Sequence, residues 1–342
     1  MRTPLTPNWS SLLAAALAGA AVGARAAEVP SPEALLDAVL AAPAIPYQGR
    51  VMVTQWFGKQ TRAEEIRVYV LPPDHVRREF LSPDGAVTRI SVSDGDIENV
   101  RLVRSGKTVR GDAARSYDKV LPPEKERELL TANYKLSAGA GEKVAGRPTW
   151  KLTLEPKIPG KSWQTFWVDH ETKVVLRSKR YQPRRSFASQ SQFNSFEARK
   201  PLDESLFRLE ASTADMIDAR GMAPDFMTLE QLNKGTDDKV DLPATLPGGF
   251  VFESADAFTV GKRRVTHARY TDGLSILSLF RTDRPVRLPK GGVLAPGAVP
   301  LPGTLRASRA GKVLHWRAGP RHYTLMSDVS RDLLGDIAKA LH

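Results

Sequence analysis

The chain has 342 residues, of which 41% are hydrophobic and 26% charged, with 25 Gly, 25 Pro and no Cys. The apolar share excludes a disordered chain, and the absence of thiols excludes a disulfide scaffold or a thiolate metal site. The length predicts two globular domains, each large enough to bury a core of its own.

The formal net charge is +12, and the surplus of basic residues is unevenly placed. Six bases and no acid lie between Lys173 and Arg185, and 13 bases against four acids lie between Phe250 and Arg321. Residues 211–249 instead hold seven acids and three bases. These zones suit anionic lipid, lipopolysaccharide phosphates or an acidic protein surface, with a solvated positive face as the alternative.

Residues 1–26 have the order of a secretory signal peptide. Arg2 precedes an apolar run from Leu12 to Ala24, and small residues surround Ala26. The run is shorter than the ~20 residues needed to cross a bilayer. We expect cleavage near Ala26 and an exported protein that does not bind nucleic acid. No Cys in the segment offers a site for a lipid anchor.

The first predicted domain covers residues 27–210. Ser31-Pro32-Glu33 starts a short helix that ends by Pro43, and alternation then predicts a strand over Tyr47–Phe57. Further strands follow, separated by Pro- and Asp-Gly-containing turns, which suggests a meander. A helix is predicted over Pro123–Tyr134. The last strand, Phe187–Phe196, is mostly polar and is predicted to lie at an edge or in an exposed position.

Residues 211–245 form the predicted linker, because they combine Pro, Gly and the acidic excess. The second domain, 246–342, is predicted to be β-rich. Its strands begin at Phe250, a Thr271-Asp272-Gly273 turn joins two of them, and a helix follows Ser330. In the turn, Gly273 is free to take a positive φ and Asp272 can accept bonds from nearby backbone.

No catalytic or metal-binding constellation is present in the sequence. A nucleophile elbow, a zinc-protease helix and a phosphate-binding loop are all missing. His315 and His322 are placed to face each other across a hairpin, but no acid lies beside them to complete a metal site. We therefore expect no enzyme activity, no metal and no cofactor.

Large apolar residues lie on both faces of several predicted strands, and a sheet that is apolar on both faces must be covered twice. One cover is the predicted helices. The other is an acyl chain or a partner segment in an apolar trough, with ordinary core packing as the alternative. The candidate trough residues are Val51, Val53, Phe57, Val68, Val70, Phe80, Trp150, Trp163 and Trp167.

Four segments together resemble one known family. They are Ile-Pro-Tyr-Gln-Gly-Arg-Val from Ile45, the strand pair at Phe166–Ser178, Leu-Pro-Gly-Gly-Phe from Leu246, and His267–Phe280 with its Tyr-Thr-Asp-Gly-Leu turn. In this order they resemble the sigma-E factor regulatory proteins, RseB/MucB. The first domain is also similar to the lipoprotein carrier LolA.

The resemblance implies an α+β fold. An N-terminal antiparallel half-barrel, lipoprotein-carrier-like and covered by helices, would be joined to a smaller C-terminal α+β domain. It also implies a periplasmic protein that binds the periplasmic part of a membrane anti-sigma factor, shields it from its first protease, and responds to lipid or lipopolysaccharide. The resemblance attributes partner contact to the C-terminal domain and the lipid response to the barrel.

The leading hypothesis is thus a non-enzymatic negative regulator of an envelope-stress sigma factor. The alternative is a periplasmic carrier of lipids or lipoproteins, and a homo-oligomer remains open in either case. The candidate partner contacts are Lys262, Arg263, Arg264, Arg269 and Tyr270. The basic side chains among them suit an acidic peptide or phosphates. Charge reversal of Lys262, Arg263 and Arg264 should therefore weaken partner binding.

Overall fold

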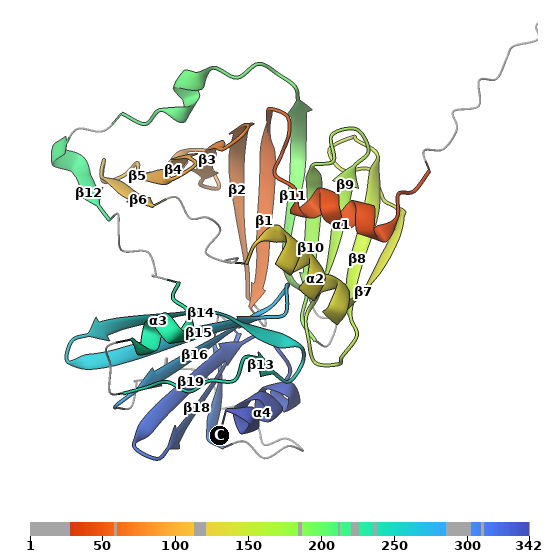
Figure 1. Ribbon diagram of the computed structural model, residues 1–342. Helices are drawn as coiled ribbons and strands as arrows, with labels where there is room; N and C mark the ends of the chain where they lie inside the picture. The colour runs from red at the N-terminus through yellow and green to blue at the C-terminus, as the bar shows by residue number, and fades with distance from the viewer. Residues whose placement is uncertain are drawn as a thin grey trace, which may run out of the picture.

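The computed structural model describes residues 28–57, 60–112, 121–183, 187–210, 213–219, 226–234, 238–284, 302–308 and 311–341. The predicted signal peptide lies outside these ranges, as does most of the Pro- and Gly-rich stretch after Arg284. Within them, none of the helices has the length and apolar character needed to cross a membrane. The described residues form two sheets, in which all strand pairs but one are antiparallel (Figure 1).

A 12-stranded sheet curls into a half-barrel, in the order β12-β6-β5-β4-β3-β2-β1-β11-β10-β9-β8-β7. The predicted meander is therefore two meanders joined where β1 pairs with β11. The strands are β1 (Tyr47–Phe57), β2 (Gln60–Leu71), β3 (His75–Leu81), β4 (Val87–Asp94), β5 (Ile97–Leu102), β6 (Thr108–Asp112), β7 (Tyr134–Ala140), β8 (Thr149–Pro156), β9 (Trp163–Asp169), β10 (Val175–Tyr181), β11 (Phe187–Ala198) and β12 (Met216–Asp218).

The prediction of an edge position for Phe187–Phe196 was wrong. This segment belongs to β11, which pairs with β1 on one side and β10 on the other. Its polar side chains have partners inside the sheet: Ser191 lies 2.9 Å from Ser178 across the β10–β11 pair. Polar composition suggests exposure, but cross-strand hydroxyl pairs allow such a strand to lie in the middle of a sheet.

Two helices cover only part of the half-barrel. Helix α1 (Pro32–Leu40) begins at the Ser31 cap as predicted, and α2 (Pro123–Asn133) begins after Pro122. They pack over β7, β8 and β9, where Leu36 and Leu130 join Leu152 and Leu154 in one buried cluster. The strands at the other end of the sheet are not covered by these helices (Figure 1).

A second cluster fills the junction of β1 and β11. It consists of Tyr47, Val70, Val144, Trp167, Leu176, Phe193 and Phe196. Tyr47 lies with its ring centroid 5.3 Å from that of Phe196. Gly49 leaves the space that the neighbouring strand needs, because a Cβ there would lie 2.3 Å from the Ser195 carbonyl oxygen. The closure of the sheet therefore depends on a residue without a side chain.

A seven-stranded sheet of order β13-β14-β15-β16-β19-β18-β17 forms the C-terminal part. Helix α4 (Arg331–Ala340), capped by Ser330, packs its buried face on this sheet. The strands are β13 (Thr245–Leu246), β14 (Phe250–Val260), β15 (Arg263–Thr271), β16 (Ile276–Thr282), β17 (Thr304–Ser308), β18 (Gly311–Ala318) and β19 (Arg321–Ser327).

The segment between the two sheets contains short elements. A 3-10 turn covers Glu204–Phe207, β12 pairs in parallel with β6, and helix α3 (Leu229–Asn233) begins at a capping box on Thr228. Leu232 packs in a small cluster with Ala255 of β14. The described parts of this segment are thus attached to one sheet or the other. Four α-helices against 19 strands make the described chain mostly β.

We expect Gly49→Ala to destabilise the half-barrel by about 1–3 kcal/mol, because the new methyl group must displace the β11 backbone. Gly111→Ala in β6 is the matched control, since a Cβ there meets nothing within 4 Å. Urea denaturation of the two variants measures the difference. Equal midpoints would contradict this account of the β1–β11 junction.

Candidate functional site

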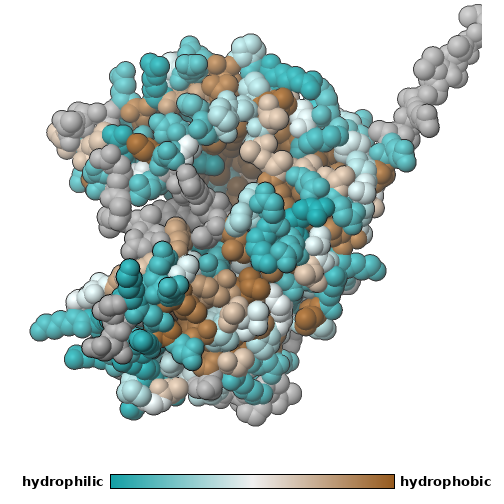
Figure 2. All heavy atoms as spheres, in the orientation of Figure 1, coloured by the Kyte–Doolittle hydropathy of each residue, from teal (hydrophilic) through white to brown (hydrophobic). Residues whose placement is uncertain are grey.

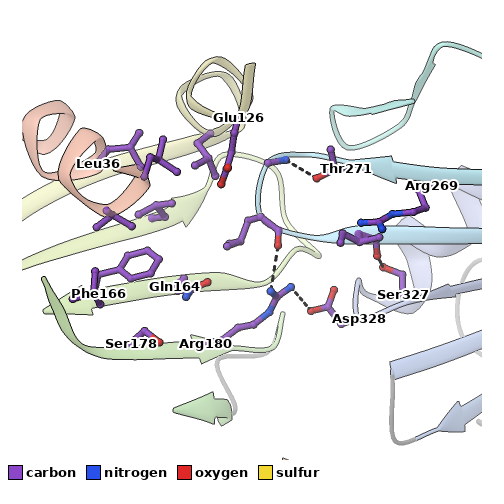
Figure 3. Close-up of a pocket in the computed structure, with 18 of the residues that line it drawn as sticks. Leu36, Glu126, Gln164, Phe166, Ser178, Arg180, Arg269, Thr271, Ser327 and Asp328 are labelled. Carbon is purple, nitrogen blue, oxygen red and sulfur yellow. Dashed lines mark hydrogen bonds and ion pairs between the residues drawn. The ribbon is translucent and has the colours of Figure 1, made fainter. Parts of the chain in front are cut away.

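A cavity of about 750 Å³ that could hold a ligand lies between the two sheets. Helices α1 and α2 with β8, β9 and β10 form one wall, and β15, β16 and β19 form the other (Figure 3). Figure 2 shows hydrophobic residues at the surface on both sides of the boundary between the two lobes. Cavities of this size hold drug-sized or acyl-bearing molecules.

The cavity has mostly apolar walls. Leu36, Leu40, Leu130, Leu154 and Phe166 line it from the half-barrel, and Leu274, Ile276 and Met326 line it from the C-terminal sheet. Because each sheet contributes apolar side chains, the cavity exists only while the two sheets hold this arrangement.

One ion pair crosses the rim of the cavity. Arg180 of β10 donates to the Asp328 carboxylate at 2.8 Å, to the Ser275 hydroxyl at 3.1 Å and to the Leu274 carbonyl at 3.2 Å (Figure 3). Ser162 donates to the same Asp328 oxygen at 2.8 Å. Burial opposes both charges, but their attraction and these hydrogen bonds hold the pKa of Asp328 below its ordinary value and the pKa of Arg180 above its own.

A second ion pair is fully buried between the sheets. The Lys161 ammonium, in the turn between β8 and β9, lies 2.9 Å from Asp272 Oδ2, and both side chains are 0% exposed. Lys161 also donates to the Gly248 carbonyl at 2.8 Å, and Tyr134 donates to Asp272 Oδ2 at 2.7 Å. Burial, followed by the nearby carboxylate, raises the pKa of Tyr134 well above its ordinary value, so the phenol remains a donor.

Asp272 serves its own turn as well. Its Oδ1 accepts hydrogen bonds from the backbone of Leu274 at 3.0 Å and of Ser275 at 2.7 Å, and Gly273 has a φ of 95°. The local geometry predicted for the Thr-Asp-Gly turn is therefore confirmed. The sequence did not predict that the other oxygen of the same carboxylate binds the half-barrel.

His267 and Arg269 of β15 add basic groups to the cavity wall. The imidazole of His267 stacks on Phe280 with centroids 4.4 Å apart. Burial, and then the charge of Arg269, lowers the pKa of His267 to about 4. Arg269 itself is mostly buried, with Nε 2.9 Å from a Glu253 oxygen. Near neutral pH the wall thus presents a neutral imidazole beside a neutralised guanidinium.

The arrangement is suited to binding. In the described residues no group of three or more His, Asp or Glu side chains could hold a metal ion. His315 and His322 do stack, with ring centroids 5.7 Å apart, as the hairpin prediction requires. A mostly apolar cavity whose lining bases Arg180 and Arg269 are ion-paired can take apolar side chains of a peptide or an acyl chain.

The structure separates the nine predicted trough residues. Trp150 lies in the cluster under α1 and α2, whereas Val51, Val68, Val70 and Trp167 lie at the β1–β11 junction. The Phe80 ring packs under Arg89, and the Trp163 ring lies 4.5 Å from that of Tyr181. Val53 is half-buried, and the side chain of Phe57 lies outside the described residues. None of the described ones lines the cavity.

The five predicted partner contacts also separate. Lys262, Arg263 and Arg264 lie at the turn between β14 and β15. Arg269 is 8% exposed and pairs with Glu253, and Tyr270 is 0% exposed, with its hydroxyl donating to the Pro243 carbonyl at 2.9 Å. The last two therefore do not form one exposed patch with the first three, because Arg269 faces the cavity and Tyr270 faces the core of the C-terminal sheet.

Among the predicted site residues that the structure describes, Arg269 lines the cavity, and the other residues of its walls were not predicted as site residues from the sequence. In the sequence, Phe166 and Leu154 have the pattern of ordinary strand residues, and Arg180 is one base in the basic run from Lys173 to Arg185. All three line the cavity. Two sequence motifs, Leu-Pro-Gly-Gly-Phe and the Thr-Asp-Gly turn, could have indicated the contact between the sheets. Both motifs supply atoms that contact Lys161, as the bonds to Gly248 and Asp272 show.

A family model described as the MucB/RseB N-terminal domain matches residues 40–211. Among solved structures, MucB from the complex of Pseudomonas aeruginosa MucA and MucB is 18% identical, with a TM-score of 0.57 over 90% of this chain and 96% of that one. MucB in complex with MucA(peri) is 17% identical, with a TM-score of 0.56 over 90% and 97%.

These two similarities extend over both sheets and show the fold alone. A LolA superfamily protein from Nitrosomonas europaea aligns over 53% of this chain and 98% of that one, at 9% identity and a TM-score of 0.27. This score is too low to establish a shared fold. No curated protein sequence matches the chain.

We expect Lys161→Met to destabilise the folded chain by about 3–5 kcal/mol, because it leaves the Asp272 charge buried without its cation. Lys200→Met, which breaks an ion pair whose side chains are 55% and 58% exposed, should cost less than about 1 kcal/mol. Urea denaturation measures the unfolding free energies of both variants.

The double variant Lys161→Met/Asp272→Asn should lose less unfolding free energy than the sum of the losses in its two single variants. Strict additivity would contradict a direct interaction.

The lowered pKa of His267 predicts a pH dependence of stability. The unfolded chain binds a proton at His267 near pH 6.5, whereas the folded chain does so only near pH 4. Its contribution is therefore fully present above pH 6.5 and is lost as the pH falls to 4, by up to about 3 kcal/mol. Urea midpoints across this range should show a shallower slope for His267→Gln. Parallel slopes for both proteins would refute the assignment.

Proposed function

Because the chain belongs to the MucB/RseB family, we propose that it is a non-enzymatic, periplasmic negative regulator of an envelope-stress sigma factor. In this proposal it binds the periplasmic part of a membrane anti-sigma factor and shields that part from its first protease. Lipid or lipopolysaccharide then relieves the shielding. Export follows from the signal peptide predicted for residues 1–26.

The observation that carries the proposal is the cavity between the sheets. It is lined from both sides by apolar groups, and the ion pair of Arg180 with Asp328, which joins the sheets, lies in its wall. A second ion pair, Lys161 with Asp272, joins the sheets as well. A polypeptide partner is supported by the two solved relatives, which are complexes of MucB with MucA. A peptide segment with apolar side chains at helical or extended spacing suits such a cavity.

Lipid sensing follows from the chemistry of the same walls. An acyl chain would lie against Leu36, Leu130 and Phe166, and an anionic head group would compete for Arg180 at the rim. Binding that recruits Arg180 removes a cation from Asp328 and from the Leu274 carbonyl. The contact between the sheets would then loosen.

Regulation requires two states with different affinities for the partner. In the first state Arg180 and Lys161 bind the C-terminal sheet, as described above, and the cavity is available to the partner. In the second state a lipid holds the sheets apart or fills the cavity, and the partner dissociates. The two ligands are then mutually exclusive, so each lowers the apparent affinity of the other.

We expect Ser278→Trp to weaken binding of the periplasmic part of the anti-sigma factor at least about tenfold, because the indole occupies the cavity from β16. Ser137→Trp on the exposed face of β7 is the matched control and should bind as the unchanged protein does. Isothermal titration measures both affinities, and protease protection of the anti-sigma factor should fall in parallel.

Lipopolysaccharide added to the preformed complex should release the anti-sigma factor from the unchanged protein. Full affinity in Ser278→Trp would remove the cavity from the account of partner binding. Abundant lipid in the purified protein, together with no measurable binding of an anti-sigma factor, would favour the alternative of a lipid or lipoprotein carrier.

A further inference from the structure

The hairpin of β14 and β15 ends in an exposed tip at a distance from the cavity. Gly261, with a φ of 62°, and Lys262 form its two-residue turn. The last β15 residue that pairs with β16 is Val265, opposite Thr282, so Arg263 and Arg264 extend past the neighbouring strand. The free end points away from α1 and α2 (Figure 1).

This tip combines exposed apolar side chains with bases. Val260 is 57% exposed and Phe258 is 39% exposed, which places both among the most exposed large hydrophobic residues described. Lys262 and Arg264 are exposed as well, and Arg263 is half-buried. No acidic residue occurs from 257 to 271, and the nearest acid along the hairpin, Asp256, pairs with His267 rather than with the bases of the tip in the strand register.

We propose that the tip of the β14–β15 hairpin docks on the surface of a phospholipid bilayer that carries anionic head groups. Phe258 and Val260 enter the interface between head groups and acyl chains. Lys262, Arg263 and Arg264 lie at the level of the phosphates. The bases supply charge complementarity and the two apolar side chains supply buried area, which is the combination that holds peripheral proteins at membranes.

The shape of the tip favours a bilayer over a protein surface. A protein partner that buries large apolar residues does so in a concave or flat interface, whose core is typically flanked by a polar rim. Here the apolar residues lie at the end of a projecting two-stranded element, beside its turn. A projecting apolar end can enter a deformable lipid interface without a complementary pocket.

Docking at the tip is independent of the proposed cavity function. The cavity is lined by His267, Arg269 and Thr271, at the opposite end of β15 from Arg263. A protein held at the bilayer by the tip keeps its cavity free for a partner or a lipid. Loss of membrane binding would therefore leave the regulator proposal standing, and loss of partner binding would leave this one standing.

Vesicle co-sedimentation of the whole protein tests the proposal. We expect the protein to bind vesicles that contain phosphatidylglycerol, to bind those of phosphatidylcholine alone much more weakly, and to dissociate as salt is raised. Lys262→Gln/Arg263→Gln/Arg264→Gln should lower the partition coefficient roughly a hundredfold. Lys135→Gln/Lys143→Gln/Lys151→Gln removes the same charge from exposed positions on the half-barrel and should leave binding within about twofold.

A site-specific label reports whether the tip enters the lipid. Since the chain has no Cys, Val260→Cys can carry a single polarity-sensitive fluorophore. Its emission should shift to shorter wavelength when phosphatidylglycerol vesicles are added. The same label at Ile158→Cys, an apolar position that is 44% exposed on the half-barrel, should not shift. Phe258→Ser/Val260→Ser should bind vesicles about tenfold more weakly.

Three results would overturn the proposal. The first is equal binding of the two triple variants to phosphatidylglycerol vesicles. The second is an unshifted Val260→Cys label on vesicles to which the protein is bound. The third is unchanged vesicle binding by the tip variants together with lost binding of the anti-sigma factor, which would make the tip a protein contact instead.

Discussion

The buried contact between Lys161 and Asp272 determines how the two sheets are placed. An ammonium and a carboxylate that are both removed from water are stable only with close geometry and further hydrogen bonds. Tyr134 and the Gly248 carbonyl provide those bonds, so few other arrangements of the sheets can satisfy the same four groups. The interaction therefore contributes specificity of arrangement more than net stability.

The cavity is a consequence of that placement. The turn that carries Lys161 also supplies the Gly160 carbonyl, which accepts a hydrogen bond of 2.6 Å from the Ser330 backbone at the start of α4. With one side of the contact tied in this way, apolar side chains of α1 and α2 face those of β16 across the cavity. Leu274, in the turn between β15 and β16, packs against the cluster under α1 and α2. Arg180 and Asp328 bridge the gap at its rim. In the proposed function, a ligand that enters the cavity would act on this contact between the sheets.

Local features of the fold could be predicted from the sequence, and long-range pairing could not. Ser31 before Pro32 correctly started α1, the alternation over Tyr47–Phe57 matched β1, and Asp272-Gly273 specified its turn, because each depends on neighbouring residues. The pairing of β1 with β11 depends on register between distant segments, so the polar β11 was wrongly placed at an edge. Lys161 has no local signal, since a lysine between Gly and Ser in a turn is usually exposed. Apart from Arg269, the residues of the candidate site were missed for the same reason, because its walls come from both sheets.

The central claim, a single arrangement of the sheets that a lipid ligand changes, is tested by the distance between them in solution. Because the chain lacks Cys, spin labels can be placed at Lys151→Cys on β8 and Lys339→Cys on α4. Double electron–electron resonance should give one narrow distance distribution for the free protein and the same distribution with the anti-sigma segment bound. It should give a shifted or broadened distribution with lipopolysaccharide. A broad distribution in the free protein, or one that lipopolysaccharide leaves unchanged, would contradict the account.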